Sequence, residues 1–192
     1  MKKIFSMVIA AAMVLMMAAC AGNNENNNSD NNDANANAPA SALEALQNIW
    51  AKYTEDDQFF AAGGDNTAPV DNAPGAVTLT NTEYLTNSLV IPTAVQSSIT
   101  EAASLMHSMN ANTFTGAAYR VSDVNGFAAA MHSALQGNQW ICGTPEKLAI
   151  ASLGGGYVVV AFGVADVMNG FQNHLKEAYP AAQMLFNEAI SG

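Results

Sequence analysis

The hydrophobic residues after position 39 follow two spacings, one typical of helices and one typical of strands. Apolar residues three to four positions apart predict helices, and runs of β-branched and aromatic residues predict strands. The expected helices are 42–53, a short segment after Thr80, 93–109, 122–136, 146–152, a helix from Asp166 and a last one from Pro180. The expected strands are 76–79, 113–121 and 157–162, and residues 61–75 are expected to be loop.

The segment 157–162, Tyr-Val-Val-Val-Ala-Phe, is the clearest strand of the chain. It is apolar at every position, so we expect it in the centre of a sheet that is covered on both faces or nearly so. The connection from strand 113–121 is long enough for a crossover, which favours parallel pairing. The predicted fold class is α+β, with a small mixed sheet, helices packed mainly on one face, and a resemblance to half of a ferredoxin-like unit plus extra helices.

The first twenty residues have a different pattern. Two lysines precede an uncharged, mostly apolar run over residues 4–17, and two alanines then lead into Cys20. This order is typical of a secretory signal peptide. The apolar run is shorter than the roughly 20 residues that span a bilayer. We therefore expect residues 1–19 to be a signal peptide outside the fold.

The sequence Met17-Ala18-Ala19-Cys20 resembles the lipobox of bacterial lipoproteins, although that family more often has Leu at the position of Met17. The resemblance implies cleavage before Cys20 and attachment of a diacylglycerol to its sulfur. Each buried methylene contributes roughly 0.8 kcal/mol, so two or more acyl chains anchor a protein stably. The expected location is extracytoplasmic and membrane-anchored. Because Ala21 is not Asp, transfer to the outer membrane would be possible in a Gram-negative cell. An ordinary secreted protein is the alternative.

Residues 20–38 form the predicted link between the lipid and the domain. Asparagine dominates this tract, which contains no aromatic or branched apolar residue. Such a segment cannot bury enough surface to offset its chain entropy, so we expect it to be disordered. A flexible coil of about eighteen residues averages roughly 20–25 Å from end to end. We expect a tether over residues 20–38 and a single domain over residues 39–192.

Net charge excludes some classes of partner. The whole chain has six basic and sixteen acidic residues, for a net charge of −10. Without Lys2 and Lys3, four basic residues remain against sixteen acidic ones, so the mature chain carries −12. Nucleic acids and anionic lipid surfaces attract clusters of Lys and Arg, so neither is an expected partner of the domain. The membrane is an expected partner through the lipid on Cys20, and any protein or small-molecule partner is left open.

Two Met-His pairs could bind a soft metal. Met106-His107 and Met131-His132 offer thioether and imidazole ligands, which suit copper. Both pairs fall in predicted helices, however, where each Met belongs to the apolar stripe. We therefore favour core methionines beside surface histidines, with His174 placed similarly next to Leu175. No metal site or cofactor is predicted.

Three further groups have both a chemical and a structural interpretation. Cys142 could be a nucleophile with a histidine as its base, but we favour a small buried residue beside Trp140. The acids 55–57 could bind a cation, but they lack the alternating ligands of a calcium loop and are expected to be solvated. The three glycines 154–156 precede a strand, so they indicate a turn and not a phosphate loop. No catalytic residue is predicted.

A longer resemblance extends over about residues 93–178. The stretch Trp140-Ile141-Cys142, followed by Pro145-Glu146-Lys147, a glycine turn and a valine-rich strand, resembles a family of small lipoproteins of unknown function typical of Gram-positive anaerobes. The Met-His-Ser segment before a strand that ends in Tyr119-Arg120-Val121 fits the same pattern. The resemblance implies no activity and no functional residue.

These patterns lead to one functional hypothesis and two alternatives. We expect a lipid-anchored extracytoplasmic protein that is a binding or structural module of the cell envelope and not an enzyme. The alternatives are a thiol-dependent enzyme that uses Cys142 and a soft-metal, copper-binding protein.

Lipid attachment can be tested in cells fed a palmitate analogue. We expect the wild-type protein to be labelled and the Cys20→Ala variant to lose the label, because the lipobox resemblance implies a diacylglycerol on the sulfur of Cys20. Cys142→Ala is the matched control and should keep the label. Equal labelling of wild type and Cys20→Ala would contradict the anchor.

Overall fold

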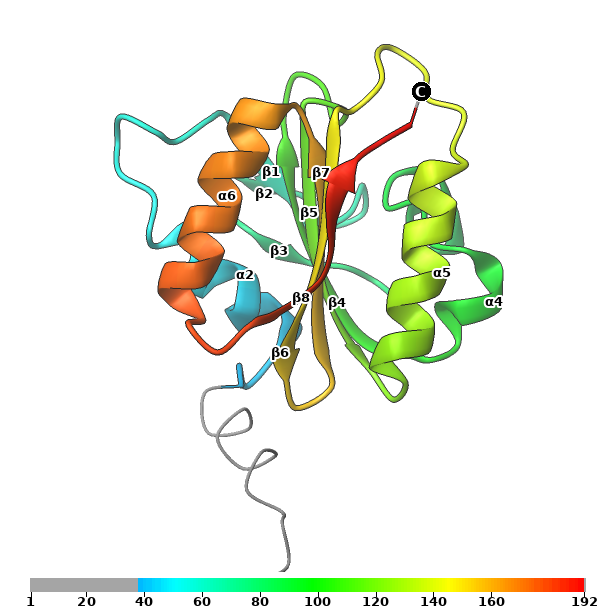
Figure 1. The fold of residues 1–192 in the computed structure, drawn as a ribbon. Helices are drawn as coiled ribbons and strands as arrows, with labels where there is room; N and C mark the ends of the chain where they lie inside the picture. The colour runs from blue at the N-terminus through cyan, green and yellow to red at the C-terminus, as the bar shows by residue number, and fades with distance from the viewer. Residues whose placement is uncertain (1–37, 192) are drawn as a thin grey trace, which may run out of the picture.

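The computed structural model describes residues 38–191, which form a sheet with helices packed against it (Figure 1). The predicted signal peptide, Cys20 and most of the tether lie outside the described residues. The helices are α2 (Ala42–Trp50), α3 (Thr82–Asn87), α4 (Thr93–Gln96), α5 (Val124–Gln136) and α6 (Ala165–Ala178). The strands are β1 (Ala61–Gly63), β2 (Val70–Asp71), β3 (Gly75–Ala76), β4 (Ile99–His107), β5 (Phe114–Val121), β6 (Lys147–Gly154), β7 (Tyr157–Gly163) and β8 (Gln183–Ala189).

The strands follow the order β2-β1-β4-β5-β7-β6-β8, and β3 also pairs with β4. The pairings between these described strands are antiparallel. Strand β7 lies between β5 and β6, and all seven of its residues are buried. The prediction of a central strand at 157–162 is therefore confirmed.

Helices cover both faces of this sheet. Figure 1 shows α2 and α6 on one side of the strands and α5 and α4 on the other. The core divides in the same way: Val159 and Ala161 of β7 pack with α2 and α6, while Val158 and Val160 pack with α3 and α5. Since neighbouring residues of a strand point to opposite faces, β7 contributes to both halves of the core. The result is a three-layer arrangement with the sheet in the middle.

The α+β class is confirmed, but the predicted arrangement within it is wrong. The sheet is antiparallel where a mixed one was expected, and the helices are not confined to one face. A ferredoxin-like half would need a parallel crossover, and the described strands have none. The error in strand direction comes from β6, which was expected to be a helix. Because β6 pairs with β7 through the glycine turn, β7 runs antiparallel to β5.

The helix predicted over residues 93–109 is also wrong. Only Thr93–Gln96 is helical, and Ile99–His107 is strand β4. The apolar residues there fit a helical spacing, but they also fill both faces of a strand: Ala103 and Leu105 belong to one half of the core, and Ala102 and Met106 pack on the other. A strand buried on both faces shows no alternation, so spacing alone cannot distinguish it from a helix.

Two shorter helix predictions fail for related reasons. The segment expected as helix 146–152 is strand β6, and the segment after Pro180 is edge strand β8. Residues 61–75, expected to be loop, contain the short strands β1 and β2 and the start of β3. The expected strand 76–79 is reduced to the end of β3. The turn at Gly154-Gly155-Gly156 is confirmed, with φ values of 81°, 60° and 84°.

Three of the predicted helices, α2, α3 and α5, begin close to their expected first residues. Ser41 caps α2 as expected, accepting a 3.0 Å hydrogen bond from the backbone N–H of Glu44. The cap of α5 is Asp123 and not Ser122, and the cap of α3 is Asn81 and not Thr80. The caps of α5 and α3 each lie one residue after the expected position. This difference is within the one or two residues by which assigned helix boundaries ordinarily vary.

The entries to α5 and α6 have similar sequences. Residues 123–127 read Asp-Val-Asn-Gly-Phe and residues 166–171 read Asp-Val-Met-Asn-Gly-Phe. Each follows a pair of adjacent strands, so β4-β5-α5 and β6-β7-α6 are two ββα units. The final Phe of each stretch, Phe127 or Phe171, is buried. The two helices nevertheless lie on opposite faces of the sheet.

A buried carboxylate organises the edge of the sheet that precedes α3. Asp65 is 2 % exposed and accepts hydrogen bonds from the backbone N–H groups of Thr67, Ala68 and Thr78, at 2.8, 3.2 and 2.6 Å. Burial alone would raise the pKa of Asp65, but the hydrogen bonds from Thr67 and Thr78 hold it well below its usual value. Asp65 therefore stays ionised and links two turns that are thirteen residues apart.

We expect Asp65→Asn to lower the free energy of unfolding by roughly 2–4 kcal/mol at pH 7, because an amide group would face backbone donors. The contribution of Asp65 is fully present above its unfolded pKa of about 3.9, since its folded pKa is depressed, and it is lost as the pH falls further. Urea denaturation at pH 7 and below pH 4 measures both effects.

Asp71→Asn, on the exposed strand β2, is the matched control and should change the stability by less than about 0.5 kcal/mol. If the two variants unfold at the same urea concentration at pH 7, the role given to Asp65 is wrong.

Candidate functional site

The structure separates the two Met-His pairs. Met106 and His107 are neighbours on β4, so their side chains point to opposite faces of the sheet. Met106 packs on the half of the core that contains α5. The His107 ring stacks on Phe59, with a centroid separation of 5.7 Å and an interplanar angle of 12°. His107 and Met106 therefore do not face a common site.

His132 has a structural partner on another element. Its Nε2 lies 2.6 Å from the Glu188 carboxylate on β8, and its ring stacks on Phe186 at 4.2 Å. Met131, which belongs to α5, is fully buried. Within residues 38–191, no group of three or more His, Cys, Asp or Glu side chains is placed to hold a metal ion.

Cys142 is exposed, so the prediction of a buried thiol beneath Trp140 is wrong. It lies in the loop between α5 and β6 with a positive φ of 67°. The Asn110 side-chain amide donates to its carbonyl at 3.2 Å. Across the described residues, no hydrogen bond or ion pair joins its thiol to a histidine. The side chain points to solvent because the loop, and not a core strand, carries it.

The acidic run 55–57 is solvated only in part. All three residues are exposed, but Asp57 also accepts hydrogen bonds from the Thr54 backbone and hydroxyl groups and lies 2.9 Å from Nε2 of His174. The sequence did not indicate this contact, because His174 lies 117 residues after Asp57, on α6.

A cleft lies where three loops meet on the α5 side of the sheet. Its volume is about 520 Å³, and its walls come from the end of α3, the β4–β5 loop and the α5–β6 loop. Four amide side chains line it together with two aromatic rings: Asn87, Asn112, Asn138, Gln139, Trp140 and Phe162. None of its lining residues is ionisable. This contrasts with the acidic character of the chain as a whole.

Side-chain hydrogen bonds fix one wall of the cleft. The Asn112 amide donates to the carbonyls of Ile141 and Gly143, at 2.6 and 2.7 Å. Asn110 adds the bond to the carbonyl of Cys142. These bonds join the β4–β5 loop to the α5–β6 loop and leave Ile141 80 % exposed at the rim. Asn112 is thus a positioning residue whose donors are already in use.

The backbone is strained at the same place. Val90 lines the cleft with a φ of 57°, a region that β-branched residues rarely occupy. Its neighbours Leu89 and Ile91 are both 1 % exposed, and their backbone N–H groups donate to the carbonyls of Tyr84 and Leu85. Cys142, next to the lining residue Ile141, is a second non-glycine residue with positive φ. Strain of this kind clusters at binding sites.

Several polar groups of the cleft have no partner among residues 38–191. The side-chain amides of Asn87, Asn138 and Gln139 form no hydrogen bond there. The indole N–H of Trp140 is buried and also unpaired, while its ring packs on Phe162 at 5.1 Å. Buried polar groups are almost always paired with protein or with ordered water, so this N–H would gain a partner from water or from a bound molecule.

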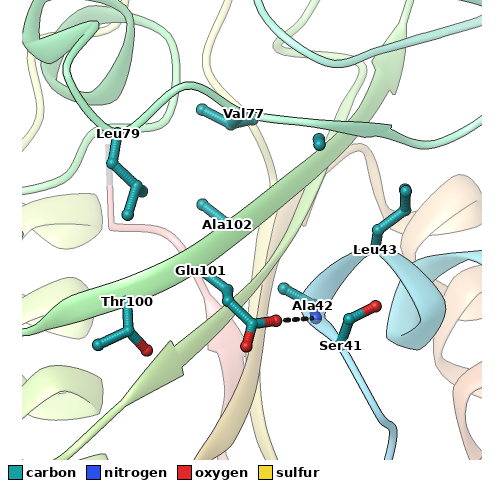
Figure 2. A pocket seen from close by; sticks show the side chains of 9 residues that line it. Ser41, Ala42, Leu43, Val77, Leu79, Thr100, Glu101 and Ala102 are labelled. Carbon is teal, nitrogen blue, oxygen red and sulfur yellow. Dashed lines mark hydrogen bonds between the residues drawn. The ribbon is translucent and has the colours of Figure 1, made fainter.

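A second groove, of about 380 Å³, differs in this respect (Figure 2). Its polar side chains are all engaged within the protein. Glu101 accepts a 3.1 Å hydrogen bond from the backbone N–H of Ala42 at the start of α2, as the dashed line shows, and pairs with Arg120. Thr100 donates to the Arg120 carbonyl. Since its polar groups already have partners, we interpret this groove as part of the packing of α2 on β3 and β4.

Comparison of the chain with protein families, curated proteins and solved structures finds no match. The cleft therefore has to be judged on its own geometry. Sequence reasoning missed it because that reasoning looked for ionisable and thiol groups, whereas the cleft consists of amides. The available signal was the polar loop Asn138-Gln139 ending in a tryptophan.

The exposure of Cys142 can be tested with a thiol reagent. We expect the native Cys20→Ala protein to react with dithiobis(nitrobenzoic acid) at a rate within roughly tenfold of the denatured protein, because no packing shields the sulfur. Cys142→Ser should not react. A native rate that is a thousandfold slower would show that the thiol is buried after all.

Proposed function

We propose that this protein is a lipid-anchored extracytoplasmic binding module whose ligand occupies the cleft beside Trp140. The lipobox-like sequence supports the anchor. No helix within residues 38–191 is long and apolar enough to cross a membrane. The observation that carries the binding role is the buried, unpaired indole N–H of Trp140 beside an uncharged cleft that is lined with solvent-accessible amides. A purely structural module would be expected to pair a buried N–H group internally.

The ligand that best fits the cleft is neutral and rich in hydroxyl or amide groups, such as a sugar or short glycan. Each amide of Asn87, Asn138 and Gln139 can donate and accept hydrogen bonds at once, as paired hydroxyl groups require. The Trp140 ring adds an apolar face. An ionic ligand would lose hydration without meeting an opposite charge, since no lining residue is ionisable.

The geometry gives little support to the two alternative functions, a thiol-dependent enzyme and a copper-binding protein. Cys142 lies next to the lining residue Ile141, which would suit a thiol enzyme, but no histidine or carboxylate contacts it in the described residues. A copper site would need Met106 and His107 to face the same way, and they do not. We therefore propose binding without catalysis.

Binding is tested by calorimetry with neutral oligosaccharides, using N-acetylglucosamine trimers and maltotriose as probes. We expect at least one probe to bind, and the Asn138→Ala/Gln139→Ala double variant to bind at least tenfold more weakly, because two amide partners are lost. Trp140→Phe should also weaken binding, because it removes the indole N–H and keeps an aromatic ring.

Asn173→Ala is the matched control, since Asn173 is an exposed amide on α6 outside the cleft. It should bind as the wild type does. If an oligosaccharide containing uronic acids binds more tightly than every neutral one, the assignment of a neutral ligand is wrong. If the double variant binds the probes as well as Asn173→Ala, the cleft is not the site.

A further inference from the structure

A separate pocket of about 250 Å³ lies on the other face of the sheet, between α6 and the segment that follows α2. Three rings form its walls. The ring of Tyr53 lies 4.1 Å from that of His174 and 6.0 Å from that of Phe59, measured between centroids. Val167 and Gly170 of α6 line it as well. This pocket has no lining residue in common with the cleft beside Trp140.

Two polar atoms of residues that line this pocket are buried without a hydrogen-bond partner among the described residues. One is the hydroxyl oxygen of Tyr53, a residue that is only 8 % exposed. The other is Nδ1 of His174, whose nearest ionic partner, the Glu177 carboxylate, is 3.6 Å away and beyond hydrogen-bond distance. Each of these atoms would gain a partner from a suitable ligand.

Carboxylates dominate the charge around the pocket. Asp57 and Asp166 line it, and Glu177 lies on the far side of the His174 ring. Burial alone would raise the pKa of Asp57, but hydrogen bonds from Thr54 and then His174 lower it, so Asp57 stays ionised. Two carboxylates thus line the pocket, and a third lies next to its imidazole ring. The pocket therefore has a negative potential.

Tyr53 stays neutral in this surrounding. Burial raises the pKa of its hydroxyl, and the negative charge of Asp57 raises it further. A neutral phenol can accept a hydrogen bond from an ammonium group, and aromatic rings attract cations through their quadrupoles. Aromatic walls with carboxylates at the rim are the usual arrangement for holding organic cations.

We propose that this pocket binds a small organic cation, namely a protonated amine with an apolar body. The ammonium group would lie near Asp57 and Asp166 and donate to the Tyr53 hydroxyl. The apolar body would pack between Phe59 and Val167. The proposal is independent of the function assigned to the cleft, because the two pockets share no residue.

Gly170 is a position at which a larger side chain would block the pocket. It lies inside α6, where glycine lowers helix stability relative to alanine, yet a Cβ at this position would meet no atom within 4 Å. Packing therefore does not require glycine here. A long side chain at residue 170 would extend into the pocket, whereas Gly170→Ala leaves most of the space open.

The experiment is calorimetric titration of the full-length chain carrying Cys20→Ala at pH 7 and low salt. The probes are phenethylamine, its neutral counterpart 2-phenylethanol and the anion phenylacetate. We expect phenethylamine to bind at least tenfold more tightly than 2-phenylethanol and phenylacetate not to bind. Gly170→Met should weaken phenethylamine binding at least tenfold, and Gly170→Ala should retain it. Asp166→Asn should weaken it severalfold.

Three outcomes overturn the proposal. Phenethylamine fails to bind at millimolar concentration, the neutral alcohol binds equally well, or Gly170→Met binds as the wild type does. A thermal melt shows whether Gly170→Met is folded. If it is not, Tyr53→Phe replaces it and should weaken binding of the amine about tenfold while keeping the ring. Asn138→Ala should leave amine binding unchanged, which separates this site from the cleft.

Discussion

Burial of the central strands on both faces is the constraint on which the rest of the structure depends. All seven residues of β7 are buried, and in the adjacent β5 only Arg120 is exposed. Such strands lose most of their stabilising burial unless both faces are covered, because apolar area removed from water supplies the main driving force. Helices α2 and α6 cover one face, and α5 with α3 covers the other. The three-layer architecture follows directly.

This arrangement also decides where binding sites can form. The interior is filled by side chains, so pockets arise at the edges of the layers, where loops meet the helices. Side-chain hydrogen bonds then stabilise those loops: Asn112 holds the α5–β6 loop, and Asp57 ties the segment after α2 to His174. The two pockets that result differ in chemistry. One offers uncharged amides, and the other offers aromatic rings beside carboxylates.

Two histidines connect helices to segments that are distant in the sequence. His132 joins α5 to the edge strand β8 through Glu188, and the pKa of Glu188 is lowered mainly by its hydrogen bond to His132 and then by Gln136. His174 joins α6 to Asp57. Both residues were expected at the surface beside core residues. Their partners lie 56 and 117 residues away in the chain, a separation that local patterns cannot bridge.

Elements with a local signal could be predicted before the fold was known. The capping residue and spacing of α2, the apolar stripe and glycine stop of α5, the strands β5 and β7 and the glycine turn before β7 are all readable from short stretches. The lipobox-like segment is also a local pattern, but it lies outside the described residues and remains a prediction. Tertiary structure alone decided that 99–107 and 147–154 are strands, because a strand buried on both faces has the same apolar density as a helix. It also decided both pockets, since their walls come from segments that meet only after the sheet has formed.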